Sequence, residues 1–161
     1  MTNLFRRLTE KDLFFLEKVL LESFNEDSER VFGKGYKNGP PGYDNGELAK
    51  KIIHNRQMTK LVIQINEMDC GVLIYHQEET YVVDYFCILP LYADKGLGSE
   101  VWRVFEEDKG GVWILETPDY SVRNHHFYKK NGFVKVAEKS YGPKAKSFIF
   151  KKEVKRISFK I

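Results

Sequence analysis

Two glycines one residue apart, Gly96 and Gly98, follow an apolar run that ends at Pro90 and precede a stretch with helical periodicity. A chain that passes from a strand through these glycines into a helix presents unpaired backbone N–H groups at the positive end of a helix dipole. A side chain at either glycine would keep an anion away from those groups, and Lys95 adds a positive charge beside them. The pattern therefore predicts a phosphate-binding loop.

The spacing of the glycines separates several kinds of phosphate-binding loop. The Gly-Lys-Ser/Thr ending of a Walker loop is absent here. A dinucleotide-binding loop needs a third glycine where Val101 stands, and a methyltransferase-like loop prefers one at Glu100. Both fit poorly, and two glycines alone are also compatible with an ordinary helix start.

Hydrophobic periodicity defines the elements that must position this loop. Three β-rich runs with short polar turns predict an antiparallel meander before the loop, whereas prolines and glycines exclude a regular element from residues 33–47. The strands on either side of the glycine helix are joined by a crossover, so they should run parallel. The expected strands are 3–9, 59–65, 70–76, 80–89, 112–117, 133–139 and 146–153. The expected helices are 10–24, 47–56, one that follows the two glycines and is ended by the Lys-Gly-Gly sequence 109–111, and 119–132. This order indicates the α/β class, a mixed sheet with helices on its faces.

Composition and charge exclude several classes of protein. Apolar runs are no longer than strands, and early charged residues such as Arg6 and Arg7 interrupt any secretion signal, so we expect a cytoplasmic protein without a membrane partner. A net charge of +3 is too small to indicate nucleic-acid binding. Cys70 and Cys87 stand in apolar runs and are expected to be reduced core thiols, with no disulfide and no metal. The basic segment 151–161 is expected to be an exposed edge strand, and the terminal strands can pair across a homodimer.

Residues 86–136 resemble the GNAT superfamily of acetyl-coenzyme A dependent N-acetyltransferases. Two signatures carry the resemblance, and each has one departure. The first is met by Ile88, Pro90, Tyr92, Gly96 and Gly98, with Ala93 at its glutamine or arginine position. The second is met by Phe127, Tyr128, Gly132 and Phe133, with Ser121 at its asparagine position.

The resemblance implies a fold and a co-substrate. The fold is a single N-acetyltransferase domain over residues 1–161, with a mostly antiparallel sheet of about six to seven strands, about four helices and splayed central parallel strands. Acetyl-coenzyme A would bind along the splay, where free backbone groups pair with its pantetheine arm like a missing strand. The implied coenzyme-binding residues are Phe86, Cys87, Ile88, Ala93, Asp94, Lys95, Gly96, Leu97, Gly98, Ser99, Ser121 and Tyr128. Ala93 removes one contact to phosphate, for which the backbone N–H groups, Lys95 or the neighbours of Asp94 can compensate.

The resemblance also implies roles in the chemistry. The N–H of Ile88 would face the thioester carbonyl and stabilise its oxyanion. Tyr128 would lie beside the coenzyme sulfur, as a general acid or only as a hydrogen-bond donor. An ordinary tyrosine pKa of about 10 against about 8.5 for a thiol makes complete proton transfer uphill.

The group that deprotonates the amine is harder to assign. By the period of two, Asp84 shares a strand face with Phe86 and Ile88. A carboxylate in an otherwise apolar strand indicates either a functional group or a structural ion pair. Glu116 ends the next strand at the same rim, and a water chain is a third route. Asp84 and Glu116 are therefore the candidate bases beside Tyr128.

The expected activity is direct acetyl transfer to a small-molecule or peptide amine, with no metal and no covalent intermediate. A coenzyme-binding sensor or interaction module on the same fold is the alternative, and Ala93 and Ser121 favour it slightly. A nucleotide-dependent methyltransferase is a third reading. The sequence does not select among amine acceptors.

Overall fold

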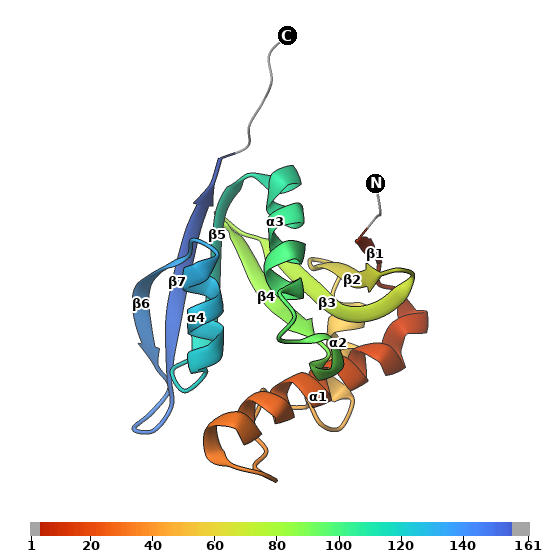
Figure 1. The fold of residues 1–161 in the computed structure, drawn as a ribbon. Coiled ribbons are helices and arrows are strands. Elements are labelled where there is room, and N and C mark those ends of the chain that lie inside the picture. The colour runs from red at the N-terminus through yellow and green to blue at the C-terminus, as the bar shows by residue number, and fades with distance from the viewer. Residues whose placement is uncertain (1–3, 156–161) are drawn as a thin grey trace.

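The first half of the sheet is an antiparallel meander. The computed structural model describes residues 4–155, and in it β1 (Phe5–Arg7), β2 (Thr59–Ile65), β3 (Met68–Gln77) and β4 (Tyr81–Ile88) lie side by side (Figure 1). Asn66 and Glu67 join β2 to β3 with φ angles of 51° and 66°. Two left-handed residues form a hairpin turn whose twist matches that of the flanking strands. The predicted meander is confirmed.

The second half of the sheet begins at β5 (Gly111–Pro118), which runs parallel to β4. β7 (Lys146–Val154) pairs antiparallel with β5, and β6 (Val134–Ser140) lies outside it, so the sheet order is β1-β2-β3-β4-β5-β7-β6. β7 as a whole lies between β5 and β6, so it is an inner strand, but the basic segment expected at an edge pairs with β6 only at Lys151, and residues 152–154 pair with β5 alone. The edge strand is β6, and residues 156–161 of that segment lie outside the described part of the chain.

In the described part of the chain, four α-helices cover the two faces of this sheet. They are α1 (Leu13–Phe32), α2 (Glu47–His54), α3 (Leu97–Lys109) and α4 (Val122–Lys130). Apolar residues of α1 and α2, among them Leu16, Leu20 and Ile52, pack on one face of the meander. Residues of α3, including Trp102 and Phe105, pack on the other face together with β5 and β7. The sheet is therefore the middle of three layers.

The helix ends follow from local sequence. α4 ends at Lys130, and Gly132 then takes a left-handed φ of 90°, as predicted from the Asn-Gly pair. α1 continues eight residues beyond the predicted end at Phe24, to Phe32. Ser28 is fully buried there, and its hydroxyl donates to the carbonyl of Asn38 at 2.6 Å, which ties the loop after α1 to the helix.

The parallel pair β4–β5 is hydrogen-bonded at one end only. Tyr81, Val82 and Val83 pair with residues 113–115 of β5, and no pairing between the two strands follows in the described chain. Figure 1 shows the two strands parting from that point, with α1 crossing below the opening. The predicted splay of the central parallel strands is confirmed.

A β-bulge lies where the two strands part. Val83 pairs with Tyr75 of β3 but Tyr85 pairs with Ile74, so Asp84 is an extra residue in β4. Bulges bend a strand and increase its twist. Asp84 therefore turns β4 away from β5 directly after their last paired residue.

No helix within residues 4–155 has the length and apolarity needed to cross a membrane.

Candidate active site

The free edge of β4 forms one wall of the opening. Leu89 donates its N–H to the carbonyl of Cys70 on β3 at 2.8 Å. Because successive backbone groups of a strand point to opposite edges, the N–H groups of Ile88 and Phe86 point away from β3, into the opening. The expected donor at Ile88 is therefore correctly oriented to contact a ligand.

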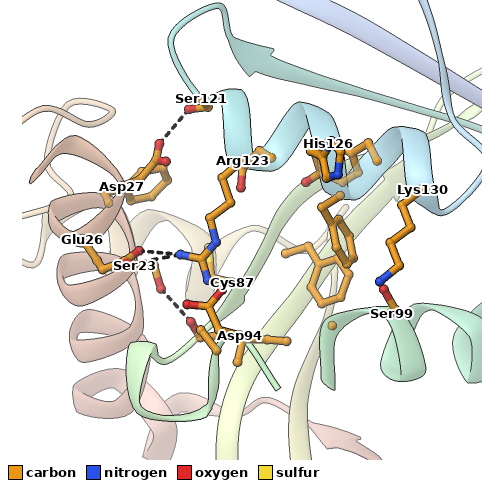
Figure 2. A pocket seen from close by; sticks show the side chains of 18 of the residues that line it. Ser23, Glu26, Asp27, Cys87, Asp94, Ser99, Ser121, Arg123, His126 and Lys130 are labelled. Carbon is orange, nitrogen blue, oxygen red and sulfur yellow. Dashed lines mark hydrogen bonds and ion pairs between the residues drawn. The ribbon is translucent and has the colours of Figure 1, made fainter. Parts of the chain in front are cut away.

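A cavity of about 430 Å³ occupies the opening (Figure 2). Side chains and backbone from α1, β4, the glycine loop, α3 and α4 line it. Ten of the twelve residues expected to bind coenzyme are among these: Phe86, Cys87, Ile88, Ala93, Asp94, Gly96, Gly98, Ser99, Ser121 and Tyr128. The other two lie elsewhere, because Lys95 is exposed and Leu97 packs into the core.

The structure requires glycine at each of the two loop positions for a different reason. Gly96 takes a left-handed φ of 74° directly before α3, and no atom lies within 4 Å of the place where a Cβ would stand. The backbone at the start of α3 is thus bare and approachable. At Gly98 a Cβ would lie 3.0 Å from the ring of Phe127, so this glycine lets α3 and α4 pack closely.

Tyr128 contributes an unpartnered hydroxyl to the cavity. Its ring packs against Phe127, Phe133 and Phe150, and its oxygen has no hydrogen-bond partner within residues 4–155. Burial, followed by the nearby Cys87 and Asp27, raises the pKa of Tyr128 well above its ordinary value. The phenol therefore stays protonated and is suited to donate a hydrogen bond.

Cys87 also lines the cavity, on the opposite face of β4 from Phe86 and Ile88. Burial raises the pKa of its thiol to about 12, and a neighbouring carboxylate, Asp27, acts in the same direction. A thiol with this pKa is a poor nucleophile at neutral pH. The Cys87 side chain is half-buried, and it lines the cavity as an uncharged thiol.

Asp84 does not line the cavity, and its predicted strand face was wrong. The bulge resets the alternation, so Val83 and Phe86 face one core while Tyr85 faces the other. The carboxylate accepts a 2.6 Å hydrogen bond from Nδ1 of His76. Burial raises the pKa of Asp84, and its hydrogen bond to His76 raises the pKa of that imidazole. The geometry is that of an ion pair at the bulge.

Glu116, the other expected base, is exposed and also lies outside the cavity lining. Leu115 and Thr117 on either side of it are buried, so Glu116 points to the opposite face of β5. Its carboxylate accepts a hydrogen bond from the hydroxyl of Tyr141. Neither carboxylate chosen from the sequence therefore lies among the cavity residues.

Three carboxylates line the cavity, those of Glu26 and Asp27 on α1 and that of Asp94 in the loop before α3. Asp27 accepts a 2.6 Å hydrogen bond from the hydroxyl of buried Ser121, which precedes α4. The hydroxyl of Ser23 lies 3.4 Å from the carbonyl of Ile88. Asp27 forms no ion pair with any residue between 4 and 155. Sequence reasoning missed these residues, because the predicted helix ended at Phe24 and the polar run 25–30 directly after it was given no role.

A group of four charged side chains closes one side of the cavity. Arg123 of α4 contacts both carboxylate oxygens of Glu26, at 3.1 and 3.2 Å, and also bonds Asp94 of the loop. Arg30 of α1 lies 2.5 Å from Glu26 and 3.6 Å from Asp94. Figure 2 shows the Arg123 guanidinium between Glu26 and Asp94. These residues, the charged quartet Glu26, Arg30, Asp94 and Arg123, tie α1, the loop and α4 together.

The described residues also include two histidines beside Tyr128, at 125 and 126. His125 is buried against Phe148 and lies 2.8 Å from the carbonyl of Pro118, so it packs α4 on the sheet. His126 is exposed and lines the cavity. No group of three or more His, Cys, Asp or Glu side chains in residues 4–155 is arranged to hold a metal ion.

Comparisons with known proteins identify the fold. No protein-family model matches the sequence, and no curated protein matches it. Among solved structures, an acetyltransferase of the GNAT family from Desulfovibrio desulfuricans has a TM-score of 0.70 at 19% identity, covering 94% of this chain and 98% of that one. The ribosomal-protein-S18-alanine N-acetyltransferase of Escherichia coli has a TM-score of 0.66 at 12% identity, covering 98% and 97%.

A third structure was solved with ligands. The spermidine N-acetyltransferase of Vibrio cholerae, in complex with CoA and spermine, has a TM-score of 0.64 at 14% identity and covers 93% of this chain and 94% of that one. These likenesses extend over nearly the whole chain. The fold expected from the two signatures, that of the GNAT acetyltransferases, is therefore confirmed.

Proposed function

We propose that this chain, which has the fold of the GNAT acetyltransferases, transfers an acetyl group from acetyl-coenzyme A to a primary amine. One observation carries the proposal: β4 turns its free backbone edge toward a cavity that also contains the bare loop at Gly96 and the unpartnered Tyr128 hydroxyl. The solved neighbour with CoA and spermine supports this assignment.

The residues present fit the coenzyme. At Gly96 a Cβ would stand in open space, so an added side chain would occupy the volume that a diphosphate needs beside the N–H groups of the loop. Along β4, the outward N–H groups of Phe86 and Ile88 can pair with the amides of a pantetheine arm. When bound, the coenzyme supplies an activated acetyl thioester.

Three side-chain or backbone groups would act on the reacting atoms. The Ile88 N–H donates to the thioester oxygen, where negative charge develops. Tyr128, protonated because burial raises its pKa, donates a hydrogen bond to the sulfur rather than a complete proton. Asp27 receives the ammonium of the acceptor, because it is a cavity carboxylate that forms no ion pair with a lysine or arginine in residues 4–155.

Amine acetylation requires a neutral nitrogen. An alkylammonium with a pKa of about 10.4 must lose its proton before attack, at a cost of about 4 to 5 kcal/mol at pH 7. Asp27 lies on the cavity wall from which such an amine would approach Ile88 and Tyr128. We assign the proton to Asp27 or to water held by it, in place of Asp84 and Glu116.

Several expectations from the sequence accompany this proposal. A single domain over residues 1–161, a cytoplasmic location and the absence of nucleic-acid and membrane partners stay predictions. A homodimer through terminal strands also stays a prediction. Both a small molecule and a peptide are compatible as the amine acceptor.

Ligand stabilisation tests the coenzyme assignment first. At about 100 to 1,000 times Kd, a ligand adds about 2.7 to 4.1 kcal/mol to the free energy of unfolding. We expect coenzyme A to raise the melting temperature and S-adenosylmethionine to leave it unchanged. The reverse result would identify a methyltransferase and refute the proposal.

Thiol release separates an enzyme from a binding module. The binding module is a second candidate because the hydroxyl of Ser121, which replaces the expected asparagine, already bonds Asp27. Incubation with acetyl-coenzyme A and a panel of primary amines should release free thiol from an acetyltransferase. A pure binder shows the melting shift and releases none.

A further inference from the structure

The loop at the start of α3 lacks a side chain that can bind phosphate at the position where the signature has glutamine or arginine. Ala93 stands there, lining the cavity with a methyl group. Lys95 is exposed and does not line the cavity. Among the lysine and arginine side chains of residues 4–155, only Arg123 and Lys130 are part of the lining. Both cationic side chains that face the cavity therefore come from α4.

Arg123 is already located beside the loop. Its guanidinium bonds the carboxylate of Asp94, two residues before Gly96, and its other contacts are with Glu26. Lys130 lies at the far end of α4, where it extends toward Ser99 in Figure 2. Of the two cations, Arg123 is the one bonded to the loop itself.

The charged quartet is neutral in the free protein, with two arginines against two carboxylates. A diphosphate at the loop adds negative charge beside Asp94, so the carboxylate and the phosphates compete for one guanidinium. A guanidinium binds phosphate oxygens through a planar fork of donors. The Asp94 side chain is 65% exposed, and exposed ion pairs contribute little, so phosphate can displace it.

The backbone at Asp94 also calls for an explanation. It takes a φ of 63°, a left-handed conformation that favours glycine and is uncommon for other residues. Asparagine and aspartate tolerate this conformation better than most side chains do, but glycine would adopt it without strain. The side chain of Asp94 contacts the two arginines of the quartet, so holding a guanidinium beside the loop accounts for a carboxylate here.

We propose that Arg123 is the side chain that binds the coenzyme diphosphate, supplied by α4 in place of the missing side chain at position 93. Asp94 and Glu26 hold its guanidinium beside the loop in the free protein, and Asp94 gives it up to the phosphates when the coenzyme binds. This inference rests on the proposed function, because it concerns the same cavity.

Calorimetric titration with coenzyme A tests the assignment without any amine acceptor. Arg123→Ala should raise Kd about tenfold, the size of one lost charge-assisted hydrogen-bonding group. Asp94→Asn should lower Kd about twofold to fivefold, because it removes both a competitor and a repulsive charge. In the Arg123→Ala background the gain from Asp94→Asn should shrink, since Arg123 is no longer there to be released.

A second ligand identifies which phosphate Arg123 binds. Dephospho-coenzyme A keeps the diphosphate and lacks the 3′-phosphate. Arg123→Ala should weaken this ligand by the same factor as coenzyme A. A loss seen with coenzyme A alone would place Arg123 on the 3′-phosphate and overturn the proposal.

Matched variants keep the test interpretable. Arg103→Ala removes an exposed arginine of α3 that pairs with Glu107 at 3.0 Å outside the cavity, and it should leave Kd unchanged. Arg123→Lys keeps the charge without the fork and should recover part of the affinity. If Arg123→Ala does not fold, the Asp94→Asn and Arg123→Lys titrations decide.

Wild-type protein that fails to bind coenzyme A would refute the proposed function. Coenzyme A binding that is equal in wild type and Arg123→Ala would refute this inference alone.

Discussion

The two ends of the β4–β5 pair differ in packing and in backbone hydrogen bonding, although they belong to the same two strands. At the closed end, the ring of Tyr81 stacks on Trp113 at 4.4 Å, and Tyr75 and Phe105 pack edge-on against the same indole. At the open end, the backbone groups of residues 86 and 88 that point away from β3 have no partner on the β5 side and face a cavity. The closed end supplies packing that fixes the geometry of the open end.

The bulge at Asp84 marks the boundary between the two ends. An opening in a sheet leaves backbone groups unpaired, which is costly, so the surrounding structure must hold the strands apart. Here the aromatic cluster clamps the strands on one side of the bulge, and α1 with the charged quartet spans the other. Changes at the closed end should therefore alter stability, and changes at the open end should alter binding and turnover.

The largest expected effect is on stability, from Trp113→Ala. Its side chain is fully buried, so truncation removes a large apolar contact and leaves a cavity. The free energy of unfolding should fall by about 3 to 5 kcal/mol, measured by chemical denaturation. Leu91→Ala, at a 73% exposed position near the open end, is the control and should change it by less than about 0.5 kcal/mol. A similar loss in both variants would mean that the closed end is not the clamp.

Tyr128→Phe should separate turnover from stability at the open end. The hydroxyl has no partner in the described chain, so its removal should leave the melting temperature and coenzyme A affinity nearly unchanged. The rate of thiol release with an active amine should fall about a hundredfold or more, the range for loss of a hydrogen-bond donor to charge that develops in the transition state. An unchanged rate would remove Tyr128 from the mechanism.

The pair His76–Asp84 should make stability depend on pH. The hydrogen bond to Asp84 raises the pKa of His76 above 6.5, so the protonated imidazole stabilises the folded state. This contribution is complete below about pH 6.5 and is lost as the pH rises through the raised value. In Asp84→Asn the pKa of His76, followed by NMR, should fall and the pH dependence should flatten. Turnover of the variant should stay within about twofold at fixed pH, whereas a hundredfold loss would restore Asp84 as a base.

The smallest effect is expected from Glu116→Gln. The side chain is exposed, its partner is Tyr141, and it does not line the cavity. Turnover should equal that of wild type, and the free energy of unfolding should change by less than about 0.5 kcal/mol. A large kinetic loss would show that the amine approaches across the other face of β5.

Much of the fold could be predicted because it depends on local sequence patterns. The glycine loop, the Asn-Gly end of α4 and the strand–crossover–strand arrangement each depend on a few adjacent residues. The bulge at Asp84 could not be predicted, since it depends on how β4 registers against β3. The second half of α1 was missed because its apolar spacing ends at Phe24, after which the helix faces the cavity with polar residues.

The backbone part of the site was more predictable than its charged side chains. The bare loop and the outward N–H of Ile88 follow from chain direction and strand alternation. The contacts of α1 with the cavity, such as Ser121 with Asp27 and Arg123 with Glu26, join residues 94 and 97 positions apart. No periodicity in the sequence reports such pairs, so the candidate bases chosen from strand pattern alone, Asp84 and Glu116, fell outside the cavity.

Amide hydrogen exchange at Ile88 tests the central claim most directly, which is that the unpaired edge of β4 receives the coenzyme. In the free protein the Ile88 amide should exchange much faster than that of Leu89, whose N–H bonds Cys70. Saturating coenzyme A should slow exchange at Ile88 by about tenfold or more and leave Leu89 unchanged. Exchange at Ile88 that coenzyme A does not alter, in a protein that binds it, would contradict the account.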